Sequence, residues 1–169
     1  KKSSNMIVAY WYFDNADLLT QSLQRLLRLI LRRISAKATP FPEAVRDLAN
    51  NHELQGSSPS TATLIETLEK AAIALEEDVF LILDAIDEYQ AGNQTLRTEF
   101  LDFLRRLGDS QIRKLHLLVT SVPDTDIKGA FMGHLTPPIE IDIEKLVSVD
   151  VEAYLDSTIR ILAYQALEP

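Results

Sequence analysis

Three carboxylates follow one apolar stretch of this chain. Residues 80–83 are all apolar, and Asp84, Asp87 and Glu88 come soon after them. Two like charges about 4 Å apart near a protein surface repel each other by roughly 4 kcal/mol, so such a cluster is costly by itself. A bound divalent cation would offset that repulsion. The spacing therefore indicates a cation site at the end of a buried strand.

The same carboxylates have a plainer interpretation as the start of a helix. Asp and Glu are favourable in the first turn of a helix because they lie at the positive end of its dipole. The cost of clustering Asp84, Asp87 and Glu88 favours the cation site over the helix start. The histidines offer no second metal site, because His52, His116 and His134 are scattered and none lies four residues from another ligand, which argues against zinc.

The composition is that of one globular domain. Of the 169 residues, 46% are hydrophobic and 25% are charged. No apolar run approaches the roughly 18 residues that span a bilayer. The net charge of −8 argues against nucleic acid as a partner, because phosphate binding requires a basic surface. The chain has no cysteine and no N-terminal signal pattern. We therefore expect a cytoplasmic protein that engages neither membrane nor nucleic acid.

Segments typical of strands and of helices alternate along the chain. The predicted strands are 6–13, the apolar stretch before Asp84, 115–121 and 139–143. The predicted helices are 18–34, 61–75, 95–107, 124–132 and 150–162. Residues 37–60 form a long connector that contains Pro and Gly, with a short helix around 43–50. The alternation predicts an α/β fold with a three-layer parallel sheet and helices on both faces.

Two surface features have alternative interpretations. Arg25, Arg28 and Arg32 form a stripe that could dock an acidic partner. Cations toward the C-terminal half of a helix are also ordinary dipole matching, so we interpret the stripe as a solvated face. The aromatic run 10–13 lies in a predicted strand. We expect it to supply core and helix contacts rather than a platform for stacking bases.

A resemblance to a known family rests on four segments in a fixed order. They are YWYFDNAD at 10–17, SLQRLLRLILRRI at 22–34, LILDAIDE at 81–88 and LHLLVTSVPDTDI at 115–127. Together they resemble a NACHT domain of the fungal NLR-like signalling NTPases, which belong to the STAND class of P-loop NTPases. The resemblance runs from Val8 to about Leu155. It implies a P-loop NTPase-like fold in which LILDAIDE is the Walker B element.

The family pattern implies a role for each matching residue. Asp84 would hold Mg²⁺ through its water shell, and Asp87 with Glu88 would polarise the attacking water. Thr120 and Ser121 would bind near the nucleotide at the C-terminal tip of the neighbouring strand, where open α/β sheets place their ligands. The implied cofactors are Mg²⁺ and ATP or GTP, bound by a longer parent protein.

Two departures from the family pattern bear on these roles. The residue after Thr120 and Ser121 is Val122, where the family usually has an arginine that reaches the γ-phosphate. The phosphate-binding motif GxxxxGK[ST] does not occur in the 169 residues. We therefore expect a single partial NACHT domain that spans 1–169, lacks the first strand and the P-loop, and binds no nucleotide by itself.

Two functions of different classes follow from the resemblance. In the first, the parent protein hydrolyses ATP or GTP, and its nucleotide state switches oligomerisation and signalling of the innate-immunity or heterokaryon-incompatibility type. Its partners would be the nucleotide and other protein chains. In the second, the chain is a degenerate NACHT-like scaffold without NTPase activity. A P-loop within about 60 residues upstream of Lys1 would separate the two.

The absent first strand also predicts an unusual sheet edge. In P-loop NTPases of this type that strand lies between the strands that correspond to 115–121 and 139–143. We expect the final strand, 139–143, to pair directly with 115–121, or two copies of the chain to associate through that edge. An exposed apolar strand edge is a template for pairing with another chain.

Overall fold

The computed structural model describes residues 6–90, 92–109, 112, 114–132, 139–143, 145, 147 and 154. The chain divides into two compact units, Lys1–Pro137 and Pro138–Pro169. The sheet and the candidate site lie in the first unit. Within the described residues, no helix combines the length and the apolar character that crossing a membrane requires.

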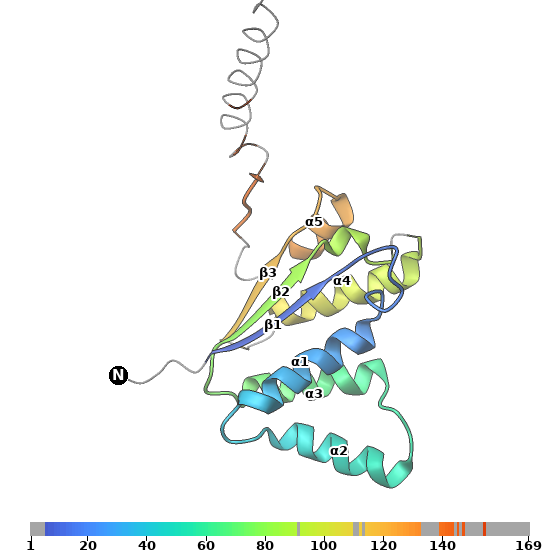
Figure 1. Cartoon of the computed structure of the whole chain (residues 1–169), viewed down its shortest axis with the longest axis vertical. Coiled ribbons are helices and arrows are strands. Elements are labelled where there is room, and N and C mark those ends of the chain that lie inside the picture. The colour runs from blue at the N-terminus through green and yellow to red at the C-terminus, as the bar shows by residue number, and fades with distance from the viewer. Residues whose placement is uncertain are drawn as a thin grey trace, which may run out of the picture. The chain divides into compact units, whose positions relative to one another are not determined.

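Three parallel strands form the sheet in the order β1-β2-β3 (Figure 1). They are β1, Ile7–Tyr12; β2, Val79–Asp84; and β3, Leu115–Val119. The register sets Tyr12 beside Asp84 and Leu83 beside Val119, so the three strands end at nearly the same level. Parallel strands joined by helices confirm the α/β class.

Five α-helices and one short 3₁₀ helix, η1, connect and follow the strands within the described residues. They are α1, Leu23–Lys37; α2, Glu43–Gln55; α3, Thr61–Ile73; η1, Ile86–Glu88; α4, Gln94–Asp109; and α5, Thr125–Phe131. The connector between α1 and α3 thus carries a helix that extends to Gln55, beyond the predicted 43–50. Ser60 caps α3, because its hydroxyl accepts the N–H of Thr63 at 3.1 Å.

Helix α1 begins five residues later than its hydrophobic pattern predicts. The Thr20 hydroxyl accepts the N–H of Asp14 at 2.9 Å and donates to the carbonyl of Asp17 at 2.8 Å. Such local side-chain bonds offer the backbone an alternative to the helix, so residues 14–20 stay in turns. Ser22 then caps the helix and accepts the N–H of Arg25. The predicted start at residue 18 was wrong for this reason.

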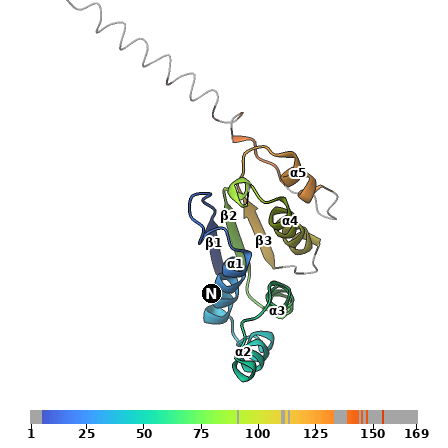
Figure 2. The same cartoon turned by 90° about the vertical axis from the view of Figure 1, so that its right-hand side faces the viewer.

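The core lies on one face of the sheet. Side chains such as Ile7, Ala9 and Leu81 are buried in one cluster with the apolar faces of α1, α3 and α4. On the opposite face, Tyr10 is 65% exposed and Leu118 is 56% exposed. Within the described residues, the expected helical layer on that face is not seen (Figure 2).

Strand order explains the open face. The strands follow one another in space as they do in sequence, and right-handed crossovers in a single direction place every connecting helix on the same side. The strand alternation also corrects the expectation for the aromatic run, because side chains on a strand point alternately to the two faces. Phe13, just after β1, is buried and Trp11 half-buried, whereas Tyr10 and Tyr12 lie on the open face.

The predicted last strand was wrong. Ile139–Asp142 has no regular secondary structure, Ile143 is helical, and Ile139 is 91% exposed. The alternating Ile, Glu and Asp residues give the segment a strand-like pattern, but a strand is stable only where a neighbour supplies backbone hydrogen bonds. The predicted pairing of 139–143 with 115–121 is therefore absent, and β3 forms an edge of the described sheet. The predicted closing helix, 150–162, lies outside the described residues apart from Tyr154, which is helical.

Candidate functional site

Two of the predicted site residues meet at the carboxyl edge of the sheet. Asp84 is the last residue of β2, and Thr120 directly follows β3. The Thr120 hydroxyl donates a hydrogen bond to Asp84 Oδ1 and accepts the N–H of Ala85 at 3.0 Å. The second carboxylate oxygen of Asp84 has no hydrogen-bond partner among the described residues, and the side chain is exposed. Asp84 is thus oriented by Thr120 while one oxygen faces solvent.

A sharp turn follows Asp84. Ala85 has a φ of 56°, in the left-handed region that residues other than glycine seldom adopt. The backbone N–H of Ile86 donates to the Thr120 carbonyl at 3.0 Å, so the turn is also bonded to the end of β3. The turn leads into η1, which carries Asp87 and Glu88.

Asp87 and Glu88 bond to loops on opposite sides of η1. Asp87 Oδ1 accepts the backbone N–H of Val122 at 3.2 Å, in the loop after β3. Glu88 Oε2 accepts the backbone N–H of Asn15 at 2.9 Å, in the loop after β1. The two acids therefore connect three neighbouring loops. Val122 takes part through its main chain, and its side chain is 60% exposed.

Ser121 is not joined to this group. Its hydroxyl donates to the carbonyl of Val122 at 2.6 Å, and the residue is exposed. Thr120 and Ser121 were expected together as nucleotide-binding residues. The structure brings Thr120 to Asp84 and gives Ser121 only a bond to its own neighbour.

Sequence reasoning missed a glutamine that holds two of these loops. Gln21 is only 8% exposed. Its amide oxygen accepts the N–H of Gln90 at 2.6 Å, and its amide nitrogen donates to the carbonyl of Asp14 at 2.9 Å. Gln90 returns a bond to the carbonyl of Gln21 at 2.9 Å. Gln21 lies just before α1 and carries no motif, so no signal in the sequence identifies it.

Sequence reasoning also missed a buried arginine beneath the site. Arg97 is 6% exposed and donates to Asp126 at 2.5 and 3.0 Å and to Asp124 at 3.1 Å. It also donates to the carbonyls of Asp87 and Tyr89 at 2.8 and 3.3 Å. The hydrogen bond between Arg97 and Asp126 raises the pKa of Arg97 and lowers the pKa of Asp126.

A signal for Arg97 does exist in the sequence. It lies three residues before Phe100 and four before Leu101, and therefore on the apolar face of its helix. A charged residue on such a face requires buried partners, and two acids supply them: Asp124, the N-cap of α5, and Asp126, in the first turn of α5.

Negative charge gathers at the edge of the open face. The charge of Glu88 is the main cause that raises the pKa of the Tyr12 phenol, with smaller contributions from burial, Asp14 and Asp84. Within the part of the chain that the structure describes, no three acidic or histidine side chains are arranged to hold a metal ion directly. Asp84 with its free oxygen fits a cation that is bound through water, with its other ligands supplied by a nucleotide or by other residues.

Comparison with known proteins identifies a family for this chain. A family model described as Nephrocystin 3, N-terminal, matches residues 1–122, a range that contains β1 to β3 and every predicted site residue. Neither the curated proteins nor the solved structures include a match to the chain.

Proposed function

The chain belongs to the nephrocystin 3 N-terminal family, and from this and the site geometry we propose that it forms the Walker B half of a NACHT-type signalling NTPase. In this proposal the nucleotide state of the protein switches its oligomerisation and its signalling. We place it in the cytoplasm, on the absence of cysteine from the sequence. Imaging of the tagged protein in cells tests that location.

The contact between Asp84 and Thr120 carries the proposal. Parallel α/β sheets bind ligands outside the carboxyl ends of their strands. Here an exposed carboxylate ends the central strand of the described sheet, and a hydroxyl from the next strand fixes its orientation. A central strand that ends in an oriented acid with a free oxygen fits the arrangement that metal-assisted phosphoryl transfer uses.

The chain's own residues have separate tasks in the proposed reaction. Asp84 would hold the water shell of Mg²⁺, and the bound ion would supply charge neutralisation of the phosphates. Glu88 has one oxygen bonded to Asn15, and its other oxygen has no hydrogen-bond partner among the described residues. That oxygen is available to accept a proton from water as a general base. Asp87 orients the same water or keeps the loop after β3 in place through Val122.

The test compares two variants in a form of the protein that contains a P-loop. Asp84→Ala should lose Mg²⁺-dependent binding of a fluorescent ATP analogue. Glu88→Gln should bind the analogue normally and release phosphate more slowly, since the amide keeps an oxygen for the N–H of Asn15 and loses the base. Asp102→Ala serves as the control, because Asp102 pairs with Arg105 on the exposed surface of α4. Equal loss of binding in Asp84→Ala and Glu88→Gln would contradict the division of roles.

The isolated chain should bind ATP weakly or not at all. Most contacts to the phosphates in this class of enzyme come from backbone amides and a lysine of GxxxxGK[ST], which is absent from the 169 residues. Calorimetry of this chain with Mg²⁺ and ATP checks the expectation. A micromolar dissociation constant would show that the described residues form a nucleotide site unaided.

One observation supports the alternative, a scaffold without NTPase activity. Asp87 and Glu88 each accept a backbone N–H from a neighbouring loop, so both have a structural task that needs no nucleotide. If the protein is a scaffold, Glu88→Gln and Asp84→Ala should leave phosphate release at the background rate of the unmodified protein. Partner binding should then persist in both variants.

A further inference from the structure

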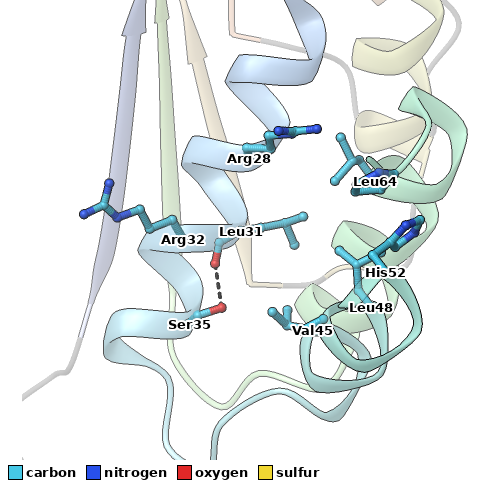
Figure 3. Close-up of a pocket in the computed structure, with 10 residues that line it drawn as sticks. Arg28, Leu31, Arg32, Ser35, Val45, Leu48, His52 and Leu64 are labelled. Carbon is cyan, nitrogen blue, oxygen red and sulfur yellow. Dashed lines mark hydrogen bonds between the residues drawn. The ribbon is translucent and has the colours of Figure 1, made fainter. Parts of the chain in front are cut away.

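An open apolar groove lies between α1, α2 and α3, on the far side of the helical layer from the strands (Figure 3). Its cavity volume is about 340 Å³. The apolar part of its lining comes from all three helices and includes Leu31, Val45, Leu48 and Leu64. A cavity of this size accepts one or two large side chains of a partner.

Arginines border the groove. Arg28 and Arg32 both line it, and Figure 3 shows the guanidinium group of Arg28 on the side of α1 that faces Leu64. Arg32 contributes from the next turn, and its guanidinium group points away from the cavity. Both arginines are exposed, and neither forms an ion pair with any described residue.

The charge of α1 is opposite to that of the whole chain. The helix contains four arginines and one lysine with no acidic residue, although the net charge of the chain is −8. Two acids of α2, Glu43 and Asp47, line a different hollow together with Lys70. Positive charge of α1 therefore lies beside the apolar floor of this groove.

We propose that the groove between α1, α2 and α3 binds a short, acidic, amphipathic helix of a partner protein. Apolar side chains of that helix fill the space between Leu31, Leu48 and Leu64, and its carboxylates pair with Arg28. Helices bind in grooves of this kind through apolar residues spaced at i, i+3, i+4 and i+7. The groove is separate from the acids at the sheet edge, so the proposal does not depend on nucleotide binding.

Two other kinds of partner fit the groove less well. Nucleic acid pairs with arginines but has no aliphatic side chain to fill an apolar cavity between helices. A membrane requires apolar residues that protrude, whereas Leu31, Val45 and Leu48 are half-buried or buried in the walls of a hollow.

The test is an anisotropy titration with a fluorescein-labelled helical peptide of about 16 residues. The peptide carries leucines on one face and glutamates on the other. Two control peptides replace either the glutamates by lysine or the leucines by serine. The chain should bind the first peptide, with an affinity that falls as salt rises, and should bind each control at least about tenfold more weakly. No binding of the first peptide, or equal binding of the serine peptide, would overturn the proposal.

Matched variants of the chain locate the binding. Arg28→Glu should weaken binding at least about tenfold, whereas Arg33→Glu, which makes the same charge change on the same helix outside the groove, should weaken it less than about threefold. Ala49→Gln fills part of the groove from an exposed position without any change of charge, and it should also weaken binding. Circular dichroism confirms that each variant is folded.

Three further results would refute binding of an acidic helix in the groove. Equal effects of Arg28→Glu and Arg33→Glu would mean general attraction to a cationic helix and would refute a groove site. Normal binding by Ala49→Gln would refute it as well. Tighter binding to vesicles that contain anionic lipid than to the acidic peptide would identify the surface as a membrane contact instead.

Discussion

Replacing Arg97 by methionine should destabilise the chain more than any exposed charge change on the same helix. Methionine keeps the aliphatic stem of the side chain in the core and removes the guanidinium group. The change leaves Asp126 and Asp124 without their cation, and it removes the donor to the carbonyls of Asp87 and Tyr89.

The loss of unfolding free energy in Arg97→Met depends on how well water can solvate the groups that lose the guanidinium. Breaking a buried ion pair by removing one member costs about 3–5 kcal/mol. The carboxylates of Asp126 and Asp124 are 30% and 42% exposed, so water restores part of their solvation. The carbonyl of Tyr89 lies in the interior and stays without the donor. We therefore expect the low end of the range, about 3 kcal/mol, against a typical total of about 5–15 kcal/mol for a domain.

The assay is urea unfolding followed by the fluorescence of Trp11. It is the only tryptophan of the 169 residues, and its ring nitrogen donates to the carbonyl of Thr20 at 3.0 Å, so its emission reports the packing of β1 and its loop. The free energy of unfolding is obtained by linear extrapolation, and an unchanged slope shows that the same surface unfolds.

Arg105→Met is the matched control. Arg105 lies on α4 as well, but its bond to Asp102 at 2.7 Å is between exposed side chains, which contributes less than about 1 kcal/mol. If Arg97→Met costs no more than Arg105→Met, the buried cluster adds nothing to stability, and the reasoning from burial fails.

Three further predictions concern acid stability, the strand ends and the sheet edge. Arg97 lowers the pKa of Asp126, so the stability that this pair contributes is present above about pH 4 and is lost as the pH falls through the folded-state pKa of Asp126. Asp126→Asn should therefore flatten the dependence of the unfolding free energy on pH in this range, as measured by urea titrations. Thr120→Val should cost about 1–2 kcal/mol and speed hydrogen exchange of the Ala85 amide, and unchanged exchange would show that the hydroxyl does not hold the turn. Sedimentation at rising concentration should reveal association through the open edge of β3, whereas a strict monomer would refute it.

The family resemblance places Thr120 and Ser121 at the tip of the strand beside Asp84, and parallel strands that end at one edge bring Thr120 to Asp84, whereas Ser121 bonds only to Val122 among the described residues. The sequence does not predict that Glu88 and Asp87 bond to different loops, because the loop backbones that donate to them have no motif. The role of Gln21 could not be predicted for the same reason, since it bonds to the main chain of Asp14 and Gln90, which carry no motif that points to it.

The errors in the predicted fold have local or topological causes. Hydrophobic spacing cannot reveal that Thr20 bonds to Asp14 and Asp17, which delays the start of α1. The alternation of strands and helices predicts parallel pairing, but the faces that the helices cover depend on the order of strands in space. The alternation of apolar and acidic residues at 139–143 is typical of a strand. It does not show whether a neighbouring strand is present to form the backbone hydrogen bonds.

The hydrogen bonds of Asp87 and Glu88 couple the position of each carboxylate to a different loop. A ligand that draws either carboxylate toward itself must break a hydrogen bond to an ionised acceptor, at a cost of about 1.5–3 kcal/mol. The loop that donated that bond then loses this contact, at Asn15 on one side or at Val122 on the other. Displacement of Glu88 would therefore act on the loop after β1, and displacement of Asp87 would act on the loop after β3.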